Sequence, residues 1–183
     1  MLEQCTDAIT AQVEAMKVLV SEFSKFAALP ATDPTPTDLN ALVSEAIAMY
    51  KGKPSIEFTA QLAEDLPELD IDREQIKRVI LNLVDNAMGA IEAAGPGPRA
   101  IALSTRIDRA VGIVQLEVAD TGCGVRPEDR ARLFQPGFST KKDGTGIGLS
   151  IVSRIVSDHS GHIRVRTNPP RGTRFVIELP ARL

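Results

Sequence analysis

Three glycines followed at once by an apolar helical pattern place the strongest constraint on how this chain can fold. The run reads G-T-G-I-G-L-S-I-V over residues 144–152. Glycine allows positive φ and close backbone approach to a ligand, and the first N–H groups of a helix are unpaired and attract anions. The run therefore predicts a tight turn or a phosphate cradle. It matches neither common nucleotide fingerprint, so other residues must decide.

Two asparagines, four residues apart, fall in the longest helix that the globular part of the sequence predicts. Apolar spacing predicts this helix over Asp72–Ala94, with Asn82 and Asn86 on one face beside the apolar stripe. Two amides there could offer oxygens to a hard cation and N–H groups to phosphate. They could equally bond to neighbouring backbone, and spacing alone leaves both interpretations open.

A carboxylate stands at the end of a predicted hairpin. Alternating residues predict strands over Ala100–Ile107 and Gly112–Ala119, and the second leads into Asp120 followed by T-G-C-G. That aspartate could accept a hydrogen bond from an exocyclic amine or could form a simple Asp-Gly turn. The long polar segment over residues 125–143 predicts a lid, in which Lys141 could reach phosphates or remain solvated.

The remaining pattern predicts further helices and strands. Capping by Thr37 or Asp38 predicts a helix over Leu39–Tyr50, and Gly161 is expected to end another. The other predicted elements are strands over Ser55–Leu62, Leu69–Ile71, His162–Thr167 and Thr173–Leu179, and a helix over Ile147–Ser160. We expect structural roles for both histidines, His159 as a C-terminal helix residue favoured by the helix dipole and His162 as a residue at the start of a strand.

The N-terminal part is predicted to be separate from the rest. Apolar residues recur in a heptad pattern over residues 2–28, which indicates one helix, either lying on its own domain or joining a dimeric bundle. Three prolines follow it and predict an extended linker. The expected organisation is therefore a partial bundle helix (1–29), a linker (30–37) and a globular domain (38–183), with a possible homodimer through 2–28.

Composition excludes several function classes. The 183 residues carry a net charge of −3 and no basic stripe, and aromatics make up only 4%, which argues against a nucleic-acid partner. No apolar run approaches the length of about 18 residues that suggests a membrane span, and no secretory signal pattern is present. Two distant cysteines fit a reducing compartment. We therefore expect a cytoplasmic location and no membrane contact by this chain.

Five motifs in order resemble sensor histidine kinases. They are similar to the N box (82–87, N-L-V-D-N-A), the D-x-G-x-G box (120–124, D-T-G-C-G), the F box (133–141, L-F-Q-P-G-F-S-T-K), the second glycine box (144–149, G-T-G-I-G-L) and the closing G-T-x-F strand (172–175, G-T-R-F). The resemblance covers residues 38–180. The phrase V-S-E-F-S-K-F-A over 20–27 resembles nitrogen-regulation kinases of the NtrY/NtrB type, in which it ends the second bundle helix.

The resemblance implies an α/β fold, a two-layer sandwich of a mixed β-sheet covered on one face by helices (the Bergerat or GHKL ATP-binding fold). It also implies ATP and Mg²⁺ as ligands, with Asn86 as the catalytic, metal-binding residue. Asp120 would bind the adenine amine. The other implied ATP contacts are Asn82, Gly122, Gly124, Thr140, Lys141, Gly144, Gly146, Gly148, Leu149 and Thr173. Two positions depart from the family pattern: Gly137 stands where the family often has a second aromatic residue, and Gly89 stands where some members carry a basic residue.

The implied activity is transfer of the γ-phosphoryl group of Mg-ATP to a histidine, for relay to a response regulator. Because no histidine precedes Pro30, we expect the acceptor on a separate histidine-bearing bundle helix of the parent kinase. Three alternatives stay open: a self-contained ATPase of the same fold, a non-catalytic nucleotide-binding or dimerising scaffold, and an anti-sigma-type serine kinase.

Overall fold

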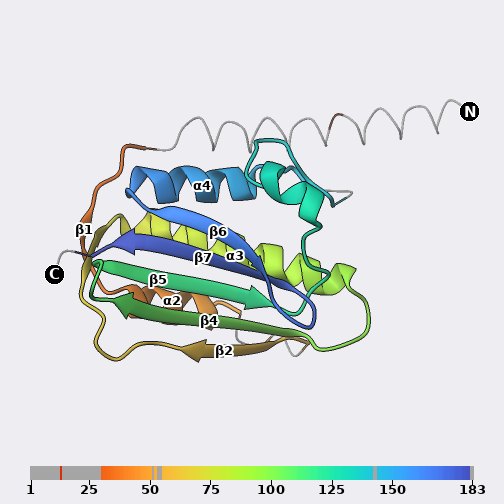
Figure 1. Ribbon diagram of the computed structural model, residues 1–183, viewed down its shortest axis with the longest axis horizontal. Helices are drawn as coiled ribbons and strands as arrows, with labels where there is room; N and C mark the ends of the chain where they lie inside the picture. The colour runs from red at the N-terminus through yellow and green to blue at the C-terminus, as the bar shows by residue number, and fades with distance from the viewer. Residues whose placement is uncertain (1–12, 14–29, 51, 53–54, 142–143, 182–183) are drawn as a thin grey trace, which may run out of the picture.

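A mixed five-stranded sheet forms the centre of the domain (Figure 1). The computed structural model describes residues 13, 30–50, 52, 55–141 and 144–181, so the predicted helix over 2–28 lies outside the described residues except for Val13. The strands in spatial order are β2 (Glu57–Gln61), β4 (Ala100–Asp108), β5 (Ile113–Asp120), β7 (Thr173–Pro180) and β6 (His162–Thr167). Only β2 and β4 pair in parallel. The predicted mixed sheet is confirmed.

One face of this sheet is covered by three helices, α2 (Leu39–Ala48), α3 (Arg73–Ala93) and α4 (Gly148–Asp158) (Figure 1). Residues alternate in and out along the strands, because successive strand side chains point to opposite faces. The inward residues of β4 and β5, such as Leu103, Leu116 and Val118, pack against apolar helix positions such as Leu83 and Ile151. This arrangement is the expected two-layer sandwich.

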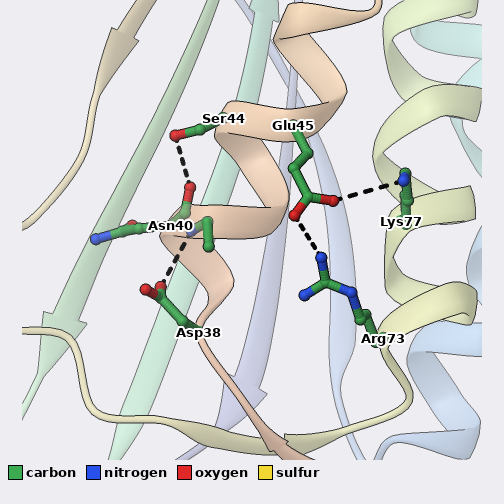
Figure 2. A network of polar contacts seen from close by, with 7 residues as sticks. Asp38, Asn40, Ser44, Glu45, Arg73 and Lys77 are labelled. Atoms are coloured by element: carbon green, nitrogen blue, oxygen red, sulfur yellow. Dashed lines mark hydrogen bonds and ion pairs between the residues drawn. The ribbon is translucent and has the colours of Figure 1, made fainter.

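Aspartates begin two of these helices. Asp38 accepts a hydrogen bond from the Ala41 N–H (3.1 Å), and Asp72 accepts one from the Gln75 N–H (3.0 Å). Each bond satisfies one of the unpaired donors at a helix start. Figure 2 shows how α2 is then tied to α3, because Glu45 contacts both Arg73 and Lys77. These ion pairs are exposed and contribute little free energy, so the buried contacts between the helices hold the layer together.

The predicted linker is partly a strand. Thr35–Thr37 form β1, which pairs antiparallel with β3 (Leu69–Ile71) in a separate two-stranded sheet. Thr37 is buried and donates through Oγ1 to the Thr35 carbonyl (2.8 Å), with the Ile71 carbonyl farther away at 3.4 Å. Sequence reasoning missed this strand because Pro34 and Pro36 suggested free extended chain. The last linker residues are therefore part of the globular fold.

The sequence predicts that Gly161 ends α4 through a left-handed backbone conformation, and the structure differs in this detail. Ser160, with φ of 56°, takes the left-handed conformation, and the Gly161 N–H bonds back to the Val156 carbonyl (2.9 Å). An added Cβ on Gly161 would lie 2.6 Å from the Glu178 carbonyl oxygen. Glycine is needed there for close approach to β7 rather than for a positive φ.

The segment between β5 and α4 contains one short 3₁₀ helix, η1 (Pro127–Arg132). Arg126 lies just before it and pairs with the buried Asp129 (2.7 Å), which holds the start of the predicted lid in a defined turn. Within the described part of the chain, no helix combines the length and the apolar character needed to cross a membrane.

Candidate functional site: a nucleotide-sized cavity

A cavity of about 800 Å³ lies between α3, the predicted lid, the glycine run and the start of β7. Its volume falls in the range of small-molecule sites, roughly 300–1,000 Å³. It brings together almost every residue that the sequence singled out: Asn82, Asn86, Asp120, Gly124, Thr140, Lys141, Gly144, Gly146, Gly148, Leu149 and Thr173. Of the predicted residues, only Gly122 does not line it.

The start of α4 opens into this cavity without a side-chain cap. Its N-cap residue is Ile147, whose side chain cannot accept a hydrogen bond, in contrast to the aspartates that begin α2 and α3. The first N–H groups of α4 are therefore available to an anion, and the helix dipole favours negative charge there. Of the two interpretations of the glycine run, the phosphate cradle fits this geometry better.

Gly146 joins the cradle to the lid. It has φ of +68°, and an added Cβ would lie 2.5 Å from the carbonyl carbon of Gly137. The Gly137 N–H donates to the Gly146 carbonyl (3.1 Å), and Gly137 itself has φ of +79°. The middle of the lid is therefore in backbone-to-backbone contact with the cradle, and the glycine at 137 serves a turn that an aromatic residue would strain.

The two asparagines of α3 lie against this cradle in different hydrogen-bonding states. Asn82 donates through Nδ2 to the Arg78 carbonyl (2.9 Å), and its Oδ1 is directed toward Gly148, where an added Cβ would lie 3.0 Å away. The side chain of Asn86 makes no hydrogen bond to any described residue. Bonding to neighbouring backbone therefore accounts only for the side-chain nitrogen of Asn82. The side-chain oxygens of both asparagines remain available to a ligand.

Lys141 approaches α3 from the lid. Its Nζ lies so close to Gly89 that any Cβ there would collide with it. This ammonium has no ion-pair partner among the described residues. Lys141 lines the cavity at Gly89, which lies one helical turn beyond Asn86. The glycine at 89, which departs from the family pattern, thus leaves room for a lysine from another segment.

Asp120 is the buried carboxylate of the site, with 2% of its surface exposed. Its Oδ1 accepts hydrogen bonds from the N–H groups of Gly122 (2.7 Å) and Thr173 (3.2 Å), and neither bond uses Oδ2. Burial raises the pKa of this carboxyl group, partly offset by those two hydrogen bonds and by the charge of Lys141. The group is held rigidly with one oxygen left to accept from a ligand.

The predicted place of Gly122 in the pocket wall is corrected by the structure. An added Cβ would lie 2.6 Å from the Ala90 carbonyl carbon, so Gly122 packs on the backbone of α3 behind the cavity. The next N–H, from Cys123, donates to the Ala90 carbonyl (3.0 Å). Gly124, with φ of +78°, does line the cavity. Gly122 therefore holds the loop in position without lining the cavity.

Several residues of the site carried no separate signal in the sequence. Asp85 accepts a hydrogen bond from the Tyr50 hydroxyl (2.8 Å) and lines the cavity beside Asn86. Burial and the Asp85 carboxylate raise the pKa of Tyr50, which therefore remains a hydroxyl donor. The Arg132 guanidinium stacks over the Phe138 ring (4.7 Å) and supports an apolar wall. The three-residue spacing from Asn82, which places both side chains on one face of the helix, could have revealed Asp85, but the Arg132 contact depends on the fold of the lid.

Comparison with known proteins gives a consistent assignment. The profile of the family described as "Histidine kinase-, DNA gyrase B-, and HSP90-like ATPase" matches residues 71–183. The chain is 31% identical to the nitrogen regulation protein NtrY of Azorhizobium caulinodans, covering 98% of this chain and 24% of that one. It is 30% identical to the signal transduction histidine-protein kinase AtoS of Escherichia coli, covering 92% and 28%.

Solved structures agree. Full-length ShkA in complex with AMPPNP matches with a TM-score of 0.76 at 28% identity, covering 97% of this chain and 38% of that chain. The histidine kinase ThkA in complex with the response regulator protein TrrA matches with a TM-score of 0.74 at 26% identity, covering 100% of this chain and 52% of that chain.

Fold and site define an ATP-binding sandwich domain. The chain belongs to the family of histidine kinase-, DNA gyrase B- and HSP90-like ATPases, and it spans about a quarter of the length of the two curated relatives.

Proposed function

We propose that this chain is the catalytic domain of a sensor histidine kinase, which binds Mg-ATP and transfers its γ-phosphoryl group to a histidine on another helix. The observation that carries the proposal is one cavity that holds both a buried carboxylate, Asp120, and an uncapped helix start at Gly148. The first suits an adenine amine and the second suits phosphates. The similarity to NtrY and AtoS supports the kinase assignment within the family.

The cavity residues divide naturally between the parts of ATP. Oδ2 of Asp120 would accept from the exocyclic amine, with Thr173 beside it. The backbone of Gly144, Gly146 and Gly148 would bind phosphate oxygens. Leu149 supplies apolar contact at the cradle, and Thr140 and Lys141 would approach the phosphates from the lid. Because the Lys141 ammonium has no ion-pair partner among the described residues, it can neutralise phosphate charge without breaking an ion pair to any of them.

A magnesium ion fits the donors present. Mg²⁺ prefers oxygen ligands and usually keeps waters and substrate phosphates in its shell. Asn86, whose amide has no hydrogen-bond partner among the described residues, would offer its oxygen, supported by Asn82. No group of three or more His, Cys, Asp or Glu residues able to hold a metal occurs in the described part of the chain, which suits an ion held partly by the nucleotide. When bound, it would neutralise phosphate charge during transfer.

The chemistry asked of the protein is positioning and charge neutralisation. The lone pair of a neutral imidazole nitrogen would form the new N–P bond as the bond from the γ-phosphorus to the bridging oxygen of ADP breaks. The imidazole then loses its other ring proton to solvent water. A neutral imidazole nitrogen is already a nucleophile, so the cavity needs no general base. Transfer onward to a response regulator, dimerisation through 2–28, a cytoplasmic location and a role in nitrogen regulation remain parts of the proposal.

The first test is calorimetric titration with ATP, with and without Mg²⁺. We expect a dissociation constant in the micromolar range, which corresponds to a binding free energy of about −8 kcal/mol. We also expect a clear gain in affinity when Mg²⁺ is added. Asn86→Ala is expected to abolish the Mg²⁺-dependent gain with the fold intact, and its titration without Mg²⁺ is the internal control. Absence of binding at millimolar ATP would contradict the proposal.

A second measurement separates the kinase from the self-contained ATPase. A histidine-bearing bundle is added with ATP, and acid-labile phosphate on that bundle is measured beside free phosphate. If the chain is a histidine kinase domain, acid-labile phosphate should accumulate on the bundle and little free phosphate should be released. Steady phosphate release without any bundle would favour the ATPase.

A further inference from the structure

The turn between β6 and β7 contacts Asp120 from outside the cavity. Asn168, the first residue of this turn, donates through Nδ2 to the Asp120 main-chain carbonyl (2.8 Å). Its own N–H donates to the Gly172 carbonyl (3.1 Å), which closes the turn. The two residues lie 48 positions apart in the chain. No motif in the sequence pointed to Asn168, and it does not line the cavity.

The orientation of the Asn168 amide is set by a second layer. Arg174 donates through Nη2 to Asn168 Oδ1 (3.1 Å) and through Nη1 to Glu117 Oε1 on β5 (3.0 Å). A guanidinium can only donate, so the group that faces Arg174 must be the amide oxygen. The amide nitrogen is then directed at Asp120. Glu117, Arg174 and Asn168 thus form a line of polar contacts that ends on the backbone of the buried aspartate.

The start of β7 holds Asp120 at two more points. Gly172 has φ of +127° and lies so close to the Asp120 carbonyl that no side chain fits between them. The Thr173 N–H donates to Oδ1 (3.2 Å). Both the backbone and the carboxylate of Asp120 are therefore positioned by this turn and the residues that follow it. A change in the turn would move the carboxylate as well as the loop.

We propose that Asn168 is a positioning residue for adenine recognition, oriented by Arg174 and Glu117. The inference rests on the proposed function, in which Asp120 reads the exocyclic amine. Discrimination by a single hydrogen bond depends on its geometry, because a misplaced acceptor loses the bond while remaining buried. The alternative is that Asn168 only closes its turn through its backbone, in which case its side chain would not affect base selectivity.

The experiment compares the affinities for ATP and for inosine triphosphate, which carries a carbonyl in place of the amine. Asn168→Asp keeps the size and the contact to Arg174 but removes the donor to Asp120. Arg174→Met removes the orienting contact. Arg166→Met is the control, because Arg166 faces Arg174 across β6 and β7, is exposed and makes no hydrogen bond to Asn168, which is also a described residue. All three substitutions change the net charge by −1, and general charge effects on the triphosphate cancel in the ratio.

We expect Asn168→Asp to reduce the preference for ATP by about three- to ten-fold, the range of one hydrogen bond. We expect Arg174→Met to reduce it in the same direction by less, and Arg166→Met to leave it within about two-fold. Thermal unfolding establishes that each variant is folded, and if Asn168→Asp does not fold, Arg174→Met decides. A clear preference in the wild type that survives in the folded variants would overturn this inference alone. Binding without preference in the wild type would overturn the role of Asp120, and this inference with it.

Discussion

At the scale of single residues, the site depends on one carboxylate whose environment is unusual. Asp120 is buried, yet two backbone N–H groups keep one of its oxygens occupied and leave the other for a ligand. The sequence alone allowed this aspartate to be part of an ordinary turn. Burial distinguishes the two interpretations, because a simple surface turn would not raise the pKa of its carboxyl group.

The raised pKa of Asp120 predicts a pH-dependent base preference. The ionised carboxylate accepts from an amine, so the preference for ATP over inosine triphosphate is full above the folded pKa. It falls as pH falls through that pKa, which lies above the ordinary aspartate value of 3.8. The ratio of the two affinities, measured by titration calorimetry, cancels the titration of the phosphates. Asp120→Asn should give a lower ratio that does not change with pH, and a pH-independent ratio in the wild type would contradict the prediction.

Gly172 gives a stability prediction at the same scale. Gly172→Ala combines a positive φ with a collision against the Asp120 carbonyl, and we expect it to lower the free energy of unfolding by about 3 kcal/mol or more. Gly95 also has positive φ, of +71°, but an added Cβ would meet no atom within 4 Å. We expect Gly95→Ala to cost about 1–2 kcal/mol. Urea denaturation compares them, and equal costs would argue against the close approach.

At the scale of elements, one histidine joins the two helices that carry the cradle and the asparagines. His159 is buried at the end of α4, where its Nδ1 bonds the Ile155 carbonyl (2.7 Å) and its Nε2 accepts from the Asp72 N–H (2.9 Å). Accepting at Nε2 requires the neutral ring with its proton on Nδ1. Sequence reasoning expected a structural residue favoured by the helix dipole, and the structure adds its contact with the start of α3.

Replacing His159 tests this tie between α3 and α4. His159→Ala removes two buried hydrogen bonds and leaves a cavity, so we expect the free energy of unfolding to fall by about 2–4 kcal/mol. His162 lies three positions later and is exposed on β6, and His162→Ala should stay within about 0.5 kcal/mol of the wild type. Denaturant titration of both variants is the measurement, and similar losses would show that the His159 contacts contribute little.

At the scale of the whole molecule, sheet order assembles the site. β5 and β7 are antiparallel neighbours, so the end of one strand and the start of the other lie together, and Asp120 meets Thr173. The parallel pairing of β2 with β4 requires a long crossover, and that crossover contains α3 with both asparagines. The same topology that builds the core therefore brings residues as far apart in the sequence as Asn82, Asp120 and Thr173 around one cavity.

Ligand binding should stabilise this whole unit. A nucleotide at 100 times its dissociation constant adds about 2.7 kcal/mol to the free energy of unfolding, and each kcal/mol shifts the melting temperature by roughly 2–4 °C in a chain of this size. We expect Mg-ATP to raise the melting temperature by roughly 5–11 °C and inosine triphosphate at the same concentration to raise it less. Equal shifts in a calorimetric scan would argue against base recognition by Asp120.

Through its family motifs the sequence identified eleven of the residues that line the cavity. By itself it determined the helices and strands with clear periodicity, such as α3. Local spacing and capping carry those signals, because neighbouring residues set them. Only the tertiary structure decided that Gly122 packs behind the cavity, that Thr35–Thr37 form a strand and that Lys141 lies over Gly89. It alone showed the contacts of Asn168 and His159, because they join residues 48 and 87 positions apart. Packing between distant segments determines such contacts, and no local pattern records it.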